Sequence, residues 1–289
     1  MNHLPASHPG TSTDHPLDAQ CRRLQRDDPR SFLAMPPAPA PSVEWAFTLR
    51  TGGVSQSPWD GGGDKGDGLN LGLYCGDEAS AVRCNRQRLA AAIGRPIVWL
   101  RQIHGTTVVD QDLCGENPAG EEAEADAQLT TRRDVALGIQ VADCLPVLLA
   151  DQQGRVVGAA HAGWRSLAGG ILQATVQAMR QKVPQAVLTA WLGPCIGPGA
   201  FEVGDEVRAA FLAALPQAEV QVAHAFTAGA QPGKWLANLS QLARLHLEAL
   251  GVTRIVGDAH CTWSDPQRFW SYRRDQRCGR MAALIWLSR

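Results

Sequence analysis

The 289-residue sequence lacks a long apolar run, an excess of charge of one sign and any C-x-x-C pair. No apolar stretch approaches the roughly 18 residues needed to cross a bilayer, so we expect no membrane span. The formal net charge is −1 and the pI is about 6.7, which give no electrostatic reason to expect a nucleic-acid partner. The first residues also lack the basic-then-apolar layout of a signal peptide, so a soluble, cytoplasmic protein is the expectation.

The cysteines are scattered along the chain, whereas the prolines gather near its beginning. Eight cysteines are scattered along the chain without regular spacing. Disulfide frameworks belong mainly to small secreted chains, so we expect reduced thiols. Residues 1–41 hold 8 of the 18 prolines and few large apolar side chains. This composition predicts a disordered or loosely packed N-terminal segment over 1–41, followed by one folded domain over 42–289.

The centre of the chain carries the pattern around which we expect the domain to form. Two apolar runs, Pro146–Ala150 and Val156–Ala160, flank Asp151–Gly154, whose composition is typical of a hairpin turn. The runs are too short for helices and are rich in Val and Leu, so they predict two strands of a buried sheet. Cys144 precedes the first strand and His161 follows the second. Because the ends of an antiparallel pair lie side by side, these two residues should meet.

The rest of the chain predicts a mixture of helices and strands without an internal repeat. Because helices and strands alternate only in places and hairpins are frequent, we predict a mixed α+β fold rather than a doubly wound parallel sheet. Apolar spacing places the main helices over residues 77–93, 163–182, 204–215 and 236–250.

His104 and His161 each lie where an apolar strand gives way to glycine, Gly105 or Gly163, which lets a backbone or ligand approach closely. Together with Cys144 they make a set of two imidazoles and one thiolate. Three protein ligands leave tetrahedral Zn²⁺ one open position, which is the arrangement of a working metal site. The spacing does not by itself bring His104 to the other two residues. A thiol–imidazole pair without metal is the alternative.

At these residues the chain resembles the laccase-domain family of YfiH-type proteins, whose members carry the names polyphenol oxidase, purine nucleoside phosphorylase and peptidoglycan editing factor. The matching blocks follow the family's order and cover about residues 43–289. They include TLRTGGVS (48–55), LNLG (69–72), QIHG (102–105), DCLPV (143–147), AHAGWR (160–165), SYRRD (271–275) and GRMA (279–282).

The resemblance implies a single domain with a four-layer α/β/β/α sandwich of mixed sheets. It implies a zinc ion, with copper as the alternative, held by His104, Cys144 and His161. The activity it implies is phosphorolysis of purine nucleosides (adenosine, inosine, guanosine and methylthioadenosine), with adenosine deaminase activity at the same site. The expected partners are a purine nucleoside and phosphate, without nucleic acid or membrane, for a monomer or homodimer.

Further residues receive hypothetical roles under this interpretation. Asp143, next to Cys144, is the candidate for proton transfer during deamination, in which the metal would activate water. Arginine forks match phosphate, and amides can contact ribose or base. The candidate substrate contacts are Arg50, Asn70, Gln102, Arg273 and Arg274.

Three other functions remain open from the sequence. Cys144 could act as a nucleophile activated by His161, in an amide hydrolase that edits peptidoglycan precursors. One Cys and two His could hold copper in a polyphenol oxidase, although multicopper chemistry needs more histidines than the expected ordered chain offers. A non-catalytic metal scaffold would have a fourth protein ligand in place of water.

Overall fold

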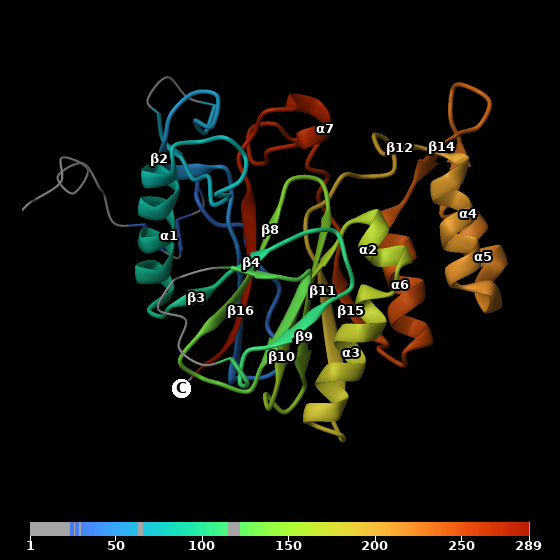
Figure 1. Cartoon of the computed structure of the whole chain (residues 1–289), viewed down its shortest axis with the longest axis horizontal. Helices are drawn as coiled ribbons and strands as arrows, with labels where there is room; N and C mark the ends of the chain where they lie inside the picture. Colours follow the sequence, from blue (N-terminus) through green and yellow to red (C-terminus); the bar gives the residue numbers. More distant parts are fainter. Residues whose placement is uncertain (1–23, 26, 29, 63–65, 115–121, 289) are drawn as a thin grey trace, which may run out of the picture.

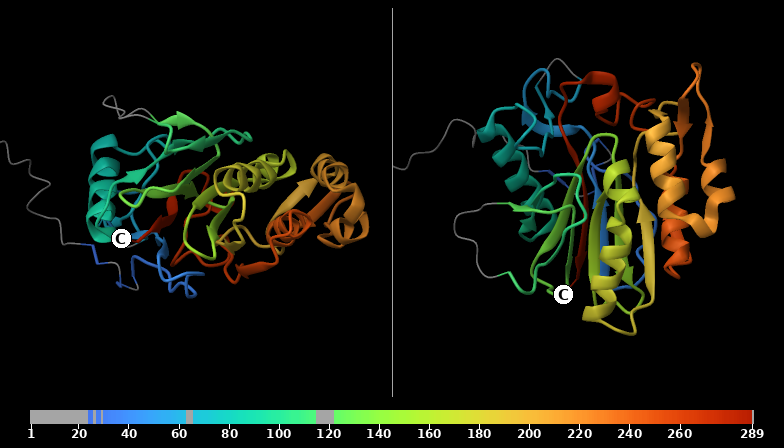
Figure 2. Two further views of the ribbon diagram at one scale, coloured as in Figure 1. Left: turned by 90° about the horizontal axis from the view of Figure 1, so that it is seen from below. Right: turned by 45° about the vertical axis from the view of Figure 1, so that its right-hand side comes forward.

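The computed structural model describes residues 24–25, 27–28, 30–62, 66–114 and 122–288. Two β-sheets pack against each other in this part of the chain, with helices on their outer sides (Figures 1 and 2). The first is a four-stranded sheet in the order β1 (Val43–Phe47), β16 (Met281–Leu287), β8 (Ala136–Val141) and β3 (Ile97–Val98). The second is a six-stranded sheet in the order β15 (Arg254–Gly257), β11 (Leu188–Leu192), β9 (Leu145–Asp151), β10 (Val157–Ala162), β7 (Ala127–Thr130) and β5 (Val108–Asp110).

Smaller elements surround the two sheets. A three-stranded sheet contains β12 (Glu202–Gly204), β14 (Lys234–Ala237) and β13 (Phe226–Ala228), and β4 (Leu100–Arg101) pairs with β6 (Ala123–Glu124), while β2 covers Thr51–Ser55. The helices are α1 (Ala79–Ile93), α2 (Trp164–Ala168), α3 (Ile171–Lys182), α4 (Asp205–Ala214), α5 (Glu219–His224), α6 (Leu239–Ala249) and α7 (Tyr272–Asp275), with a 3₁₀ turn at Pro216–Ala218. Helix α1 lies outside the first sheet, and α3 and α6 lie outside the second (Figure 1).

Strand β9 is buried on both faces, which explains its continuous apolar sequence. Leu148 and Ala150 face the core between the two sheets, where they share a cluster with Trp45 and Ile285. The alternate residues of β9, such as Leu149, pack in the core that includes α3 and α6. A strand between two apolar layers needs no polar side, so the period-2 alternation disappears.

The mixed α/β, single-domain prediction is confirmed, and the sheets contain both parallel and antiparallel pairs. The four-layer sandwich is a finer description that stays a prediction. The three-stranded sheet and helices α4 and α5 form a further part at one side of the molecule (Figure 2). The helix predicted over 163–182 is two helices, α2 and α3. It breaks at Gly169 and Gly170, and Gly170 has a φ of 96°, a left-handed conformation that favours glycine.

Two other sequence predictions need correction. The helix predicted from Leu236 begins at Leu239, because Asn238 caps it by accepting a hydrogen bond from the Gln241 N–H, and the preceding residues form β14. The stretch before Cys144, for which the sequence predicted no element, forms β7 and β8.

The N-terminal segment predicted to be disordered lies partly outside the described residues, so that prediction and the domain boundary stay untested for residues 1–23. Within the described part, the prediction of loose packing needs correction. Phe32 is 5% exposed, forms an antiparallel bridge with Thr48, and packs with Leu24 in the core beneath α1. No helix among the described residues is both long and apolar enough to cross a bilayer.

Candidate metal centre and its cavity

Cys144 and His161 meet at one end of the β9–β10 hairpin, as the sequence pattern predicted. In the antiparallel register His161 pairs with Pro146 and Ala162 pairs with Leu145. Cys144 therefore lies just before the first residue of β9, on the link from β8, where the chain passes from the first sheet to the second. The ligand atoms of His104, Cys144 and His161 all lie within 4.8 Å of one another.

His104 reaches the other two residues through an unusual backbone conformation. It follows β4 and has a φ of 61°, in the left-handed region. Its Nε2 lies 3.7 Å from the Cys144 Sγ, and its ring lies edge-on to that of His161 at a centroid distance of 4.8 Å. Gly163 makes this approach feasible, because a Cβ there would lie 3.0 Å from both the Cys144 Sγ and the His104 Cδ2.

Asp126, which precedes β7, connects the two histidines and was not singled out as a site residue from the sequence. Its fully buried carboxylate accepts a hydrogen bond from the His161 Nδ1 at 2.8 Å and from the backbone N–H groups of Ile103, His104 and Gly105 at 3.2, 2.9 and 2.6 Å. Burial would raise the Asp126 pKa, but the bond from His161 and the backbone bonds lower it below its usual value. The carboxylate therefore fixes the His161 ring so that Nε2 is left for a ligand.

The three side chains by themselves favour a thiolate next to an imidazolium. Burial would raise the Cys144 pKa, yet the charge of His161 and the hydrogen bond to His104 lower it to about 6. For His161, burial alone would lower the pKa, whereas the Cys144 thiolate and the bond to Asp126 raise it to about 9. Because a metal ligand must be a thiolate or a neutral imidazole, Cys144 is prepared to bind and His161 would release a proton on metal binding.

The geometry fits a first-row metal ion. Zinc bonds of about 2.3 Å to sulfur and 2.05 Å to nitrogen place the two donors about 3.6 Å apart in a tetrahedron. The observed distance between the His104 Nε2 and the Cys144 Sγ is 3.7 Å, and all three donor atoms lie within 4.8 Å of one another. A thiolate with two imidazoles suits zinc and copper alike, so the donors define a metal site without selecting the ion. Within the described residues this is the only such group of three or more.

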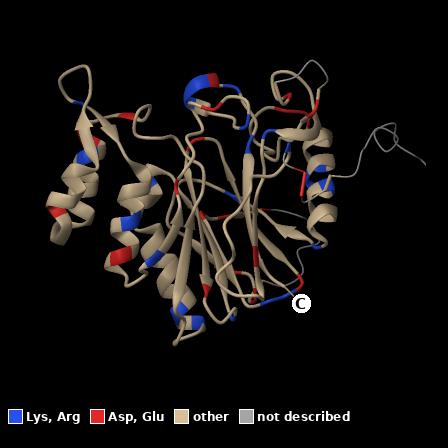
Figure 3. Ribbon diagram, turned by 180° about the vertical axis from the view of Figure 1, so that it is seen from behind, with Lys and Arg blue, Asp and Glu red and all other residues tan. Residues whose placement is uncertain are grey.

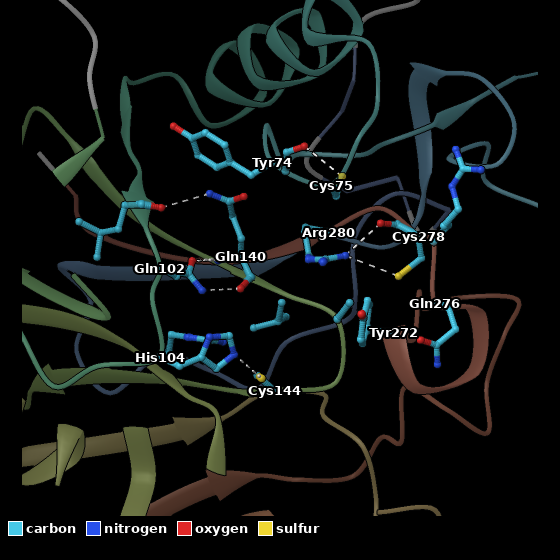
Figure 4. Close-up of a pocket in the computed structure, with 16 residues that line it drawn as sticks. Tyr74, Cys75, Gln102, His104, Gln140, Cys144, Tyr272, Gln276, Cys278 and Arg280 are labelled. Carbon is cyan, nitrogen blue, oxygen red and sulfur yellow. Dashed lines mark hydrogen bonds between the residues drawn. The ribbon is translucent and has the colours of Figure 1, made fainter. Parts of the chain in front are cut away.

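The cluster opens into a cavity of about 630 Å³, a volume typical of small-molecule sites (Figure 4). Two tyrosines and two arginines lie in its wall, and no described residue that lines it carries a carboxylate. The chain has only two tyrosines in total, and both line this cavity. The polar and aromatic lining residues are Tyr74, Gln102, His104, Gln140, Cys144, His161, Tyr272, Gln276, Arg277 and Arg280.

Of the predicted substrate contacts, only Gln102 lines the cavity. Its Nε2 donates to the Gln140 carbonyl and its Oε1 accepts from the Gln140 N–H, both at 2.8 Å, so the backbone of β8 holds its amide in place. Arg50 lies elsewhere. It donates to the Pro266 carbonyl and lies over the Trp270 ring at 5.7 Å. Arg50 therefore supports the loop around Pro266 rather than the cavity.

The predicted arginines of α7 also lie outside the cavity wall. Arg274 donates to the carbonyl groups of Thr262, Trp263 and Phe269, and Arg273 donates to that of Glu202. They make much of the short helix α7 blue in Figure 3, next to the red of Asp275. Neither residue lines the cavity, and the Arg274 guanidinium is also paired with Asp275, so the assignment of phosphate binding to Arg273 and Arg274 needs correction.

Asp143 and Asn70 are likewise occupied within the protein. Asp143 is 9% exposed, with a φ of 88°, and its carboxylate accepts from the Thr262 and Ser271 hydroxyls and the Arg273 N–H at 2.6, 3.0 and 2.6 Å. It therefore ties α7 to the Cys144 link, and it does not line the cavity, which argues against a role in proton transfer. Asn70 is fully buried, and its Nδ2 donates to Asp77 at 2.8 Å, which contradicts a direct substrate contact.

The fold and the site together define a class of protein: a single mixed α/β domain with a His–Cys–His cluster where its two sheets meet. A model of the family described as multi-copper polyphenol oxidoreductase laccase matches residues 44–288, and the chain belongs to this family.

Among its relatives, a Pseudomonas aeruginosa protein named purine nucleoside phosphorylase is 47% identical over 251 residues, covering 87% of this chain and 96% of the relative. Purine nucleoside phosphorylase YfiH of Escherichia coli is 44% identical over 261 residues, covering 89% and 99%. Among solved structures, a Neisseria meningitidis protein is similar with a TM-score of 0.79 at 45% identity, covering 90% and 100%, and YlmD from Geobacillus stearothermophilus with 0.81 at 28%, covering 93% and 100%.

Proposed function

We propose that the protein is a zinc-dependent purine nucleoside phosphorylase that accepts adenosine, inosine, guanosine and methylthioadenosine, and that it also deaminates adenosine at the same site. The observation that carries the proposal is the opening of the His104–Cys144–His161 cluster into one cavity large enough for a nucleoside and an anion. The names of the relatives support the phosphorylase activity, and the thiolate–imidazole donor set supports the metal.

The residues of the cavity would position the two substrates for reaction. Tyr74 and Tyr272 are 68% and 51% exposed, so each ring has open surface on which a purine could stack. Arg277 and Arg280 supply positive charge in a wall without carboxylates, which suits phosphate. Holding both substrates in one cavity makes attack of phosphate at the ribose C1′ effectively unimolecular. When bound, zinc would supply Lewis-acid chemistry and the ability to activate water.

Purified protein tests the proposal directly. It is incubated with adenosine, with and without phosphate, and the products are separated. Ribose 1-phosphate and adenine that form only with phosphate support phosphorolysis, and inosine that forms in both samples supports deamination. Chelation and the Cys144→Ser variant should abolish both activities. Release of free ribose without phosphate, or no turnover of any of the four nucleosides, would contradict the proposal.

A second candidate is a cysteine-type amide hydrolase, such as one that edits peptidoglycan precursors. It is favoured by the lowered Cys144 pKa and by the His161–Asp126 hydrogen bond, which together resemble an activated nucleophile with an oriented base. A nucleophilic thiol would be alkylated by iodoacetamide and would keep its activity after chelation, whereas a ligand thiolate would be shielded and chelation would stop the reaction.

A copper-dependent polyphenol oxidase has less support. The described residues contain only one cluster of three ligands, which provides for a single ion. Multicopper oxidation needs several copper ions and many more histidine ligands.

A further inference from the structure

Arg280 lies in the cavity wall with part of its guanidinium available to a ligand. Its Nη1 donates to the carbonyls of Cys278 and Gly279 at 2.9 and 3.1 Å, and its guanidinium lies 5.8 Å from the Tyr272 ring centroid. No hydrogen bond of Nε or Nη2 to another described residue is present. Figure 4 places Arg280 between Tyr272 and Gln140, in the same cavity as His104 and Cys144.

The backbone of Arg280 is fixed by a loop from the other end of the chain. Asn70 Oδ1 accepts hydrogen bonds from the N–H groups of Arg280 and Gly72 at 2.8 and 2.9 Å, and the Leu71 N–H donates to the Arg280 carbonyl at 3.1 Å. Asn70 is itself held by Asp77, to which its Nδ2 donates. This buried amide therefore positions the residue that precedes β16.

Gly72 leaves the space through which the Arg280 side chain passes. A Cβ on Gly72 would lie 2.6 Å from the Arg280 Cγ and 3.2 Å from its Cβ. The backbone conformation of Gly72 is one that other residues can adopt, since its φ is not in the positive range. Glycine is therefore required at position 72 because a larger residue would overlap the Arg280 side chain, and not because of a turn.

We propose that Arg280 is the principal anion-binding residue of the cavity, that it holds a phosphate group beside the metal cluster, and that Asn70 and Gly72 are positioning residues that direct it there. The inference rests on the proposed function for the identity of the anion as inorganic phosphate. The site itself requires only a phosphate group, which could also be the phosphate ester of a nucleotide. Arg277 contributes less, because it is exposed and lies over the Trp59 ring at 5.5 Å.

The test measures binding of phosphate to the metal-loaded protein without turnover. Equilibrium dialysis with labelled inorganic phosphate compares wild type with Arg280→Gln and Arg280→Lys, and metal content is measured in each. Loss of a charge-assisted hydrogen bond should weaken binding by about 10- to 100-fold for Arg280→Gln. Arg280→Lys keeps the charge but loses the fork, so its loss should be smaller. Arg254→Gln, at an exposed arginine outside the cavity wall, is the matched control and should bind as wild type does.

The Gly72→Ala variant tests the positioning residues. It should weaken phosphate binding in the same direction as Arg280→Gln, while its metal content stays close to that of wild type. Wild-type phosphate binding in Gly72→Ala would refute the role of Gly72.

The possible results separate the two proposals. Phosphate binding that does not change in Arg280→Gln overturns the inference, whatever the enzymatic activity. Binding that depends on Arg280 in a protein without phosphorolysis supports the anion site and contradicts the proposed function. If adenosine 5′-monophosphate binds in an Arg280-dependent manner and inorganic phosphate does not, the ligand is a phosphate ester. If neither binds to wild type, both proposals are wrong.

Discussion

Replacement of Asp126 by asparagine should loosen the metal site and destabilise the fold at the same time. The Asp126 Oδ1 accepts from the His104 N–H and the His161 Nδ1, and Oδ2 accepts from the Ile103 and Gly105 N–H groups. Asparagine has the same shape but only one acceptor oxygen. In either orientation, its NH₂ group faces two donors, at a side chain that is 0% exposed.

The cost follows from the loss of acceptors. Each buried donor without a partner costs about 1 to 3 kcal/mol, so two such donors lower the free energy of unfolding by about 2 to 6 kcal/mol. The hydrogen bond that orients the His161 ring also weakens, and loss of such a bond typically reduces metal affinity by about 10- to 100-fold.

Two measurements on Asp126→Asn check this reasoning. Urea denaturation of chelator-treated protein gives the change in unfolding free energy without a contribution from bound metal. Competition with a chelator of known affinity gives the metal dissociation constant. Asp134→Asn is the control, because Asp134 is 64% exposed and pairs only at the surface with Arg132. If Asp126→Asn matches wild type in both measurements, Asp126 does not organise the site.

Three further predictions concern separate parts of the molecule. Cys144→Ser should reduce bound metal in the purified protein to a small fraction of wild type, because a hydroxyl is a much poorer zinc ligand than a thiolate; full metal content by elemental analysis would contradict the assignment. Tyr272→Ala should raise the KM for adenosine by about 5- to 150-fold through loss of stacking, whereas Tyr272→Phe should keep the wild-type KM. Steady-state kinetics measures both, and an unchanged KM in Tyr272→Ala would contradict the stacking role. His246 is 7% exposed and burial lowers its pKa from 6.5 to about 4. Above pH 6.5 His246 is neutral in the folded and in the unfolded protein. Between pH 6.5 and pH 4 only the unfolded chain takes up the proton, so the free energy of unfolding should fall by about 2 kcal/mol from pH 7 to pH 5. His246→Leu should remove this part of the pH dependence in urea titrations, and identical slopes for the two proteins would count against it.

The metal cluster could be predicted from the sequence because two of its members depend on a local pattern. A turn between two apolar runs fixes which residues of a hairpin are neighbours, so the meeting of Cys144 and His161 followed from chain order alone. The proximity of His104 agreed with its position before a glycine, but its left-handed backbone and the contact with Gly163 depend on tertiary packing.

The surroundings of the cluster could not be predicted in the same way. Asp126 stands alone before a short strand, and nothing nearby in the sequence shows that its carboxylate accepts four hydrogen bonds. Arg274 and Arg280 are only six positions apart, yet one binds three protein carbonyls and the other lines the cavity. The direction of a long side chain is set by distant segments, in this case Gly72 and the loop at Thr262. The one sequence signal for the position of Arg280 is the LNLG block, because its Asn70 accepts from the Arg280 N–H and its Gly72 leaves room for the Arg280 side chain.

The position of the cluster at the junction of the two sheets has a consequence for how the protein acquires its ion. The cores on both sides of β9 are built from apolar side chains whose burial needs no bound ion, so the sheets can assemble before any metal arrives. Loading would then occur on a finished domain, through the mouth of the cavity, unlike a zinc finger, which needs its ion to fold. Because the donors accept zinc and copper alike, the ion found in the protein would reflect which metal the cell supplies rather than which one the folding chain selects.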